Sequence, residues 1–259
     1  MKVAVSGTAD GVRTSKENRL LAICYGVVCH IVFMLGVGTM MVAMFFGMSR
    51  SLGRVPAPWS WVANIALLAA FPLAHSLLLT NRGRTVLTRL APRDSGSTLS
   101  ATTFASIASV QVFVLFAFWS PTGTVWWHAE GLAFDVLCAL YAMAWLLLGK
   151  AMMDAGLGLQ TGSLGWTALF RGRKPVYPGM PASGLFRFSR QPIYVAFALT
   201  VWTVPTWTPD QLAIAVTLTL YCLVGPLFKE ARFRRIYGSD FDSYARNVPY
   251  WLPRRRSRG

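Results

Sequence analysis

The stretch at residues 191–209, QPIYVAFALTVWTVPTWTP, contains no charged side chain. After Asp210, a second uncharged stretch follows at residues 211–228. Each stretch is close to the roughly 20 apolar residues that a helix needs to cross the hydrocarbon core of a membrane. Together they predict a hairpin of membrane-spanning helices, with Arg190 at its entrance and Lys229-Glu230 at its exit.

The charges at the two ends of this hairpin need a physical reason. A charged side chain beside the membrane core is costly to desolvate, so it is found where it pairs with another group or binds a ligand. A salt bridge between Glu230 and a nearby arginine is the simplest account. A binding site for a charged ligand at the mouth of the hairpin is the alternative that the following observations favour.

Composition extends the membrane interpretation to the whole chain. Hydrophobic residues make up 54% of the 259 residues and charged residues 14%, whereas soluble domains carry about 25% charged residues. We expect a single membrane domain, with four spans before residue 150 and a loop, the hairpin and a tail over residues 150–259. The long apolar stretches predict an all-α polytopic membrane protein with six transmembrane helices, at residues 20–48, 58–80, 98–119, 126–149, 191–208 and 211–228. All are uncharged except 126–149, which has Glu130 and Asp135 near its start.

Lysines and arginines predict the orientation. Four of them precede Leu20, four lie in residues 81–97, six lie in 150–190 and nine follow Phe228. Since cytoplasmic segments are enriched in these residues, we expect both termini to be cytoplasmic in a multi-pass protein of the bacterial inner membrane. Because the cations flank the spans, the net charge of +15 indicates contact with membrane lipid and not with nucleic acid.

The sequence does not contain the residue patterns of several other kinds of site. The four cysteines lie inside apolar spans and form no C-x-x-C pair, which argues against a zinc or redox site. Gly156-Leu157-Gly158 has neither a preceding strand nor a third glycine at the right spacing, so it is not a dinucleotide fingerprint. The three histidines are scattered over different spans. We therefore predict no metal site.

Two polar segments remain as candidates for a site. Residues 150–190 are rich in glycine and proline and carry embedded aromatic residues. A loop of this length in a compact fold is usually functional or disordered. Beyond Gly238, Phe241 and Tyr244 recur at helical spacing among charged residues, which predicts a C-terminal amphipathic helix on the cytoplasmic interface.

These segments carry a family resemblance. Residues 183–194, SGLFRFSRQPIY, resemble the G-x-Y-x-x-x-R-H-P-x-Y motif of the isoprenylcysteine carboxyl methyltransferase superfamily. The tail from Glu230 through Gly238 resembles the E-E-x6-F-G motif of that superfamily, which continues into a Y-x-x-x-V-P pattern. Shorter matches around Ala74-His75-Ser76 and residues 154–160 resemble a narrower branch, the bacterial methanethiol S-methyltransferase-like membrane proteins.

The resemblance implies S-adenosyl-L-methionine as a methyl donor, bound at the cytoplasmic face without a Rossmann domain. It implies that Arg190 and Glu230 act in catalysis, and that Lys229 and Gln191 depart from the usual acid and histidine. The residues expected around the donor are Gly184, Phe186, Arg190, Gln191, Pro192, Tyr194 and Glu230. The residues expected on the acceptor side are His75, Gln160, Arg187 and Tyr244.

The residue chemistry is consistent with this donor. A guanidinium such as that of Arg190 binds a carboxylate through two parallel hydrogen bonds. Glu230 can neutralise the amino group or the sulfonium, and the rings of Phe186 and Tyr194 can face adenine or the cation. The nearby Arg187 and Arg190 can lower the pKa of an acceptor thiol.

We therefore expect methyl transfer to a small thiol such as methanethiol, which can reach the site through the bilayer. Methylation of a lipid amine or of a lipidated cysteine carboxylate is the alternative reaction. A non-enzymatic membrane protein, with a role in assembly or transport, is the alternative class. The residues do not indicate an oligomeric state.

Overall fold

The structure, a computed structural model, describes residues 16–251. Most of this part of the chain is helical, with one short antiparallel ribbon. The helices are α1 (Lys16–Phe45), α2 (Trp59–Leu78), α3 (Asn81–Leu90), α4 (Gly96–Ala117), α5 (Gly131–Asp154), α6 (Leu157–Gln160), α7 (Ser163–Phe170), α8 (Pro192–Trp202), α9 (Pro209–Tyr237) and α10 (Ser239–Asn247). The remaining elements are the 3-10 turns η1 (Arg93–Ser95) and η2 (Gly184–Arg187) and the strands β1 (Trp127–His128) and β2 (Thr206–Trp207).

Between residues 16 and 251, five helices are long and apolar enough to cross a membrane, namely α1, α2, α4, α5 and α9. Large apolar side chains on their outer faces are exposed, among them Ile31, Leu73 and Leu146. Extensive exposed apolar surface marks contact with a membrane or a partner. The protein is therefore an all-α, multi-pass membrane protein, as the composition predicted.

The sixth expected span, at residues 191–208, is shorter than predicted. Its helix α8 has 11 residues, which corresponds to about 16 Å at 1.5 Å per residue, against about 30 Å for the hydrocarbon core. The helix ends before Val204-Pro205 because a residue that precedes proline is disfavoured in the α conformation. The chain then forms β2, which pairs with β1 through Trp127↔Trp207 and His128↔Thr206.

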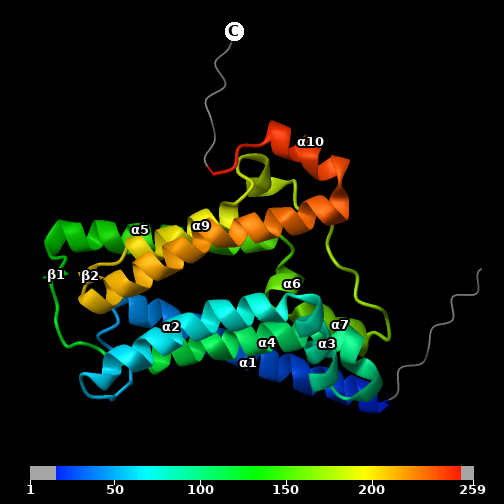
Figure 1. Cartoon of the computed structure of the whole chain (residues 1–259), viewed down its shortest axis with the longest axis horizontal. Helices are drawn as coiled ribbons and strands as arrows, with labels where there is room; N and C mark the ends of the chain where they lie inside the picture. The colour runs from blue at the N-terminus through cyan, green and yellow to red at the C-terminus, as the bar shows by residue number, and fades with distance from the viewer. Residues whose placement is uncertain (1–15, 252–259) are drawn as a thin grey trace, which may run out of the picture.

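Two groups of helices form the molecule (Figure 1). One group contains α1, α2 and α4, and the other contains α5, α8 and α9. A buried core joins them, with Met44 from α1, Phe116 from α4 and Ile214 from α9. The β1–β2 ribbon lies at one end of the molecule, while α3, α7 and α10 lie at the other end. The segments that contain α3, α7 and α10 were all expected on the cytoplasmic side of the membrane, and in the structure they lie at the same end of the fold.

Asp210 fixes the ribbon end of α9. Its carboxylate is buried, with the residue only 3% exposed. Oδ1 accepts a hydrogen bond from the Trp119 indole at 2.9 Å, and Oδ2 accepts from the Thr122 amide at 2.9 Å and its hydroxyl at 2.7 Å. Because both oxygens are satisfied, the buried charge is tolerated. The charge that separates the two uncharged stretches therefore has a structural role.

Replacing Asp210 with alanine is expected to destabilise the protein. The indole of Trp119 and both donors of Thr122 would lose their acceptor, and each buried donor left unpaired costs about 1–3 kcal/mol. The melting temperature of the detergent-solubilised protein should fall by several degrees. The control is Asp240→Ala, which removes an exposed carboxylate on α10 and should leave melting unchanged. Equal melting temperatures for the two variants would contradict this account of Asp210.

The first half of the polar segment at residues 150–190 packs against the transmembrane helices. Trp166 of α7 donates from its indole to His30 Nε2 at 3.2 Å. The same ring covers Gly26, where a Cβ atom would lie 2.7 Å from the indole. Thr102 of α4 donates to the Gly162 carbonyl at 2.6 Å. The α6–α7 segment is therefore anchored on α1 and α4, and the chain from residue 171 onward leads back to α8.

Candidate functional site

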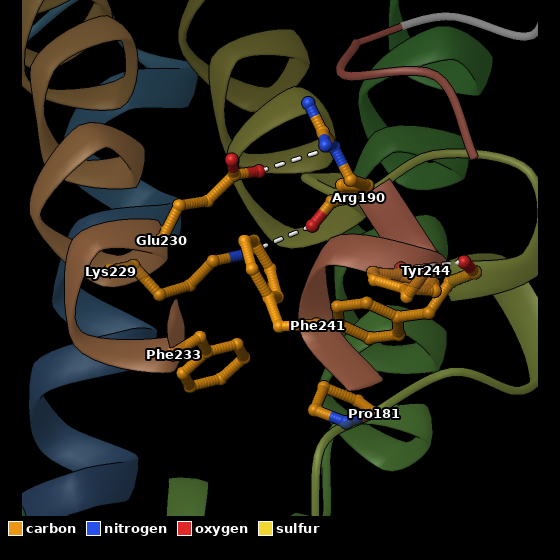
Figure 2. Close-up of a pocket in the computed structure, with 8 residues that line it drawn as sticks. Pro181, Arg190, Lys229, Glu230, Phe233, Phe241 and Tyr244 are labelled. Atoms are coloured by element: carbon orange, nitrogen blue, oxygen red, sulfur yellow. Dashed lines mark hydrogen bonds and ion pairs between the residues drawn. The ribbon is translucent and has the colours of Figure 1, made fainter. Parts of the chain in front are cut away.

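Arg190 and Glu230 lie side by side at the end of the molecule that carries α10. Arg190 immediately precedes the buried start of α8, and Glu230 lies on α9 just beyond its uncharged stretch. The distance from Arg190 Nε to Glu230 Oε1 is 3.2 Å, and the two side chains are only 14% and 11% exposed (Figure 2). Arg190 Nε is buried, yet it makes no aligned hydrogen bond within the described residues. The charges are thus paired, but the guanidinium edge is not fully used.

Gln191 and Lys229 complete a network around this pair. Gln191 is fully buried, and its Nε2 donates to Glu230 Oε1 at 2.7 Å. The Lys229 ammonium donates to Gln191 Oε1 and to the Arg190 carbonyl, the latter at 2.9 Å. We call Arg190, Gln191, Lys229 and Glu230 the charged network. It holds two cations and one carboxylate, so it carries an excess positive charge.

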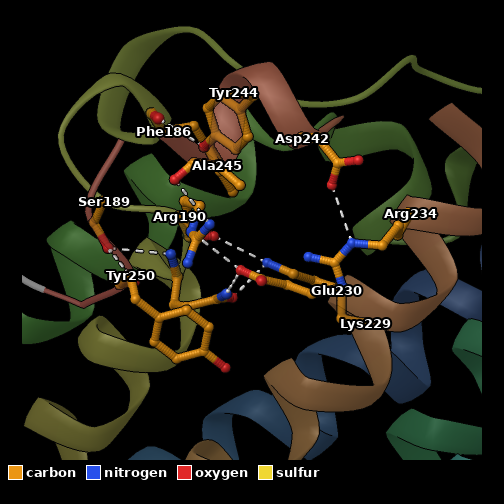
Figure 3. A network of polar contacts seen from close by, with 11 residues as sticks. Phe186, Ser189, Arg190, Lys229, Glu230, Arg234, Asp242, Tyr244, Ala245 and Tyr250 are labelled. Carbon is orange, nitrogen blue, oxygen red and sulfur yellow. Dashed lines mark hydrogen bonds and ion pairs between the residues drawn. The ribbon is translucent and has the colours of Figure 1, made fainter. Parts of the chain in front are cut away.

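The C-terminal segment closes over Arg190. Arg190 Nη1 donates to the Ala245 carbonyl at 3.1 Å (Figure 3). The Arg190 amide donates to the Pro249 carbonyl at 3.0 Å. The guanidinium carbon lies 5.0 Å from the centre of the Tyr250 ring, within the range of a cation–π contact. These contacts hold residues 245–250 against the start of α8.

Tyr244 connects α10 to the loop before α8. Its hydroxyl donates to the Phe186 carbonyl at 2.8 Å (Figure 3). Burial raises the pKa of Tyr244 to about 12, so the phenol keeps its proton at neutral pH. It is therefore a stable hydrogen-bond donor in this structure and not an acid or base that titrates near pH 7.

A small pocket adjoins the charged network (Figure 2). In this structure its side chains leave no room for a water molecule between them, whereas typical small-molecule sites measure about 300–1,000 Å³. Its wall combines three charged groups with aromatic rings. The lining residues are Pro181, Phe186, Arg190, Lys229, Glu230, Phe233, Phe241 and Tyr244.

The residues expected around the donor fall into two groups. Phe186, Arg190 and Glu230 line the pocket, with Gln191 directly behind Glu230. The other residues lie farther out. Pro192 is the buried first residue of α8, the Tyr194 ring packs against Gly225, and Gly184 has a positive φ of 58° and packs on the carboxylate of Asp154.

The residues expected on the acceptor side do not gather at one place. Tyr244 lines the pocket, whereas Arg187 is exposed and lies outside the described lining. His75 packs among Phe71, Phe104 and Tyr221 within the spans. Gln160 ends α6, on the segment anchored to α1 and α4.

Some residues at the pocket were not assigned to the site from the sequence. Lys229 was noted only as a departure from a motif, although it contacts both Arg190 and Gln191. Phe241 was expected only on the face of an amphipathic helix, and at the pocket its ring centre lies 6.2 Å from that of Phe233. The repeated aromatic residues on both sides of Gly238 were the available signal, because α9 and α10 fold back on each other there.

The fold and the site together define a class: an all-α, multi-pass membrane protein with a buried charged network at the ends of two apolar helices. Within residues 16–251, no group of three or more histidine, cysteine or acidic residues is placed to hold a metal ion.

Comparison with known proteins gives matches to methanethiol S-methyltransferases and to nurim. The chain is 25% identical to methanethiol S-methyltransferase 1 of Bradyrhizobium diazoefficiens over 94% of this chain and 86% of that protein. It is 27% identical to the methanethiol S-methyltransferase of Mycobacterium tuberculosis over 91% of this chain and 97% of that protein. It is also 25% identical to nurim of Xenopus laevis over 69% of this chain and 68% of that protein.

These similarities confirm the resemblance that the sequence motifs indicated. No family model matches the chain, and no solved structure matches it.

Proposed function

We propose that the protein is a membrane methyltransferase that transfers a methyl group from S-adenosylmethionine to a small thiol. The observation that carries this proposal is the buried ion pair of Arg190 and Glu230 beside an aromatic-lined pocket. Similarity over more than nine-tenths of the chain to proteins named methanethiol S-methyltransferase supports the reaction class and the kind of acceptor.

The side chains at the pocket fit the chemistry of this donor. Its carboxylate matches the guanidinium of Arg190, whose Nε is buried and not used in an aligned hydrogen bond within the described residues. Its amino group or its sulfonium matches the carboxylate of Glu230. The rings of Phe186, Phe233 and Phe241 offer surfaces for adenine and for the cation.

The pocket has to widen before it can hold a molecule of this size, since its side chains now leave no room even for a water molecule. The contacts that close it are single hydrogen bonds, from Arg190 Nη1 to Ala245 and from Tyr244 to Phe186. We propose that the donor enters as α10 and the loop before α8 move apart, and that these contacts re-form over it. Such closure would exclude water from the reacting atoms.

When bound, S-adenosylmethionine supplies an activated methyl group on a sulfonium, open to in-line displacement. The reaction needs alignment and exclusion of water more than acid–base groups. Arg190 and Glu230 would hold the two charged ends of the donor in one orientation. Phe241 is 1% exposed and would keep the far side of the pocket dry. In this way the network would position the methyl group without forming a bond to it.

We place the site at the cytoplasmic face of a bacterial inner membrane. Support comes from the many lysines and arginines in the segments at this end of the molecule, including the three arginines of α3 and the four cations near the end of α9. An apolar thiol such as methanethiol can cross the bilayer and approach from the membrane side. Arg50 and Arg54, near the ribbon end, run against this assignment.

The proposal is tested with purified protein, radiolabelled S-adenosylmethionine and a panel of acceptors. The panel contains methanethiol, a longer alkanethiol, phosphatidylethanolamine and a prenylated cysteine. We expect label in the methyl thioether of the small thiols. Label found only in the lipid or only in the prenylated cysteine would contradict the thiol assignment. Absence of donor binding by calorimetry, together with no labelled product, would favour a non-enzymatic membrane role.

A further inference from the structure

Lys229 is a partly buried cation whose hydrogen-bonding capacity is not exhausted. An ammonium has three N–H donors, and within the described residues two of them have hydrogen-bond acceptors, the Arg190 carbonyl and Gln191 Oε1. Its remaining surroundings are aromatic, since Nζ lies 5.7 Å from the ring centres of both Tyr194 and Phe233. Lys229 also lines the pocket (Figure 2). The ammonium can therefore donate a hydrogen bond to one further group on the pocket side.

Lys229 is the first charged residue after the uncharged stretch of α9. Tyr194, over whose ring the ammonium sits, packs against Gly225, one turn earlier on α9. Tyr194 and Lys229 thus lie where the charged network meets the apolar helices, so an acceptor that arrives through the membrane can reach this ammonium.

The charge balance at the site favours an anionic acceptor. Arg190 and Lys229 outnumber Glu230, so the network already has an excess positive charge. The proposed donor adds a sulfonium and an amino group against one carboxylate, which increases that excess. An anion at the remaining position would reduce the repulsion between these cations.

We infer that Lys229 is the acceptor-binding residue of this site and that its ammonium holds the thiol as a thiolate beside the donor. This inference rests on the proposed function. The thiol loses its proton to solvent, and the thiolate sulfur forms a new bond to the methyl carbon. The bond from the methyl carbon to the donor sulfur breaks, and its electron pair stays on that sulfur. The products are a neutral methyl thioether and S-adenosylhomocysteine.

The two arginines considered from the sequence are less suited to this role. Arg187 is exposed and outside the described pocket lining. Arg190 contacts Glu230 and the Ala245 carbonyl, and the proposed function gives its unused Nε to the donor carboxylate. Lys229 also lines the pocket within the described residues and has no role in holding the donor, and it stands where the related motif has an acid.

The test replaces Lys229 with methionine, which keeps the length of the side chain and removes the charge. We expect the affinity for S-adenosylhomocysteine, measured by calorimetry, to change less than about fivefold. The rate of ethanethiol methylation should fall about 100-fold, the size typical of one activating group. With benzenethiol, a much more acidic thiol, the rate should fall less than about tenfold because little activation is needed. Arg235→Met, which removes an exposed arginine from the same helix, should match the wild type.

A second readout does not depend on turnover. Benzenethiolate absorbs in the ultraviolet, so the protonation of bound benzenethiol can be titrated in the presence of S-adenosylhomocysteine. The midpoint should rise by at least one pH unit in Lys229→Met relative to the wild type. An unchanged midpoint, or equal rate losses with both thiols together with weakened binding of S-adenosylhomocysteine, would show that Lys229 only ties α8 to α9. Wild-type protein that methylates no thiol would overturn the proposed function itself, and this is measured first.

Discussion

Replacing Glu230 with glutamine is expected to weaken the binding of S-adenosylmethionine by about 100-fold or more. The substitution keeps the shape of the side chain but leaves the Arg190 and Lys229 cations without their carboxylate. Removing one partner of a buried, hydrogen-bonded charge pair between a site and its ligand costs about 2–5 kcal/mol of binding free energy, and each 1.4 kcal/mol corresponds to about tenfold in affinity. The loss should affect a cationic ligand most, since the site becomes more positive. Calorimetry on the detergent-solubilised protein measures the effect.

The matched control for this variant is Asp242→Asn. Asp242 also pairs with an arginine, at 3.0 Å from Arg234 Nε, but the two side chains are 45% and 57% exposed. Exposed pairs contribute little because solvent screens them, so donor affinity should stay at the wild-type value. Equal affinities for Glu230→Gln and Asp242→Asn would mean that Glu230 has only a structural role.

Replacing Arg190 with alanine is the second large expected effect. The variant loses the partner of Glu230, the hydrogen bond to Ala245 and the contact with Tyr250. Donor binding should weaken by at least about 100-fold, as for the loss of a charged hydrogen-bonding partner in a buried site. The segment at residues 245–250 should also become more susceptible to limited proteolysis. Calorimetry and a protease time course measure the two consequences separately.

Arg190→Lys and Arg187→Ala distinguish the possible reasons for this loss. Lysine restores the charge but not the planar fork that binds a carboxylate through two hydrogen bonds, so it should recover only part of the affinity. Arg187→Ala removes an exposed arginine three residues earlier and should bind the donor like the wild type. Full recovery by lysine would argue against a bidentate clamp at this position.

The transmembrane core could be predicted from the sequence because its signal is local. Five of the six apolar stretches became long apolar helices, with ends within a few residues of the expected ones for α2 and α4. The length of α8 was only partly local information. Its end depends on Val204-Pro205 and on pairing of Thr206 and Trp207 with a strand almost 80 residues earlier, which no periodicity within the stretch reveals.

The site was only partly predictable for a related reason. The motif residues Arg190 and Glu230 were expected to converge, and the structure brings their side chains to 3.2 Å. The position of Lys229 depends on how α9 rotates against the start of α8, and Tyr250 reaches Arg190 only because α10 turns back at Gly238. These are tertiary arrangements that the residues do not state individually. Gly184 was assigned to the donor from its motif, while its packing on Asp154 becomes visible only in three dimensions.

The central claim is that one sulfonium ligand binds between the guanidinium of Arg190 and the carboxylate of Glu230. The most direct test is an experimental structure of the protein with S-adenosylmethionine bound. The account predicts the donor carboxylate at Arg190, the amino group or sulfonium at Glu230, and an open pocket where the side chains now leave no room for a water molecule. A donor bound elsewhere, with the Arg190–Glu230 pair still closed, would contradict it.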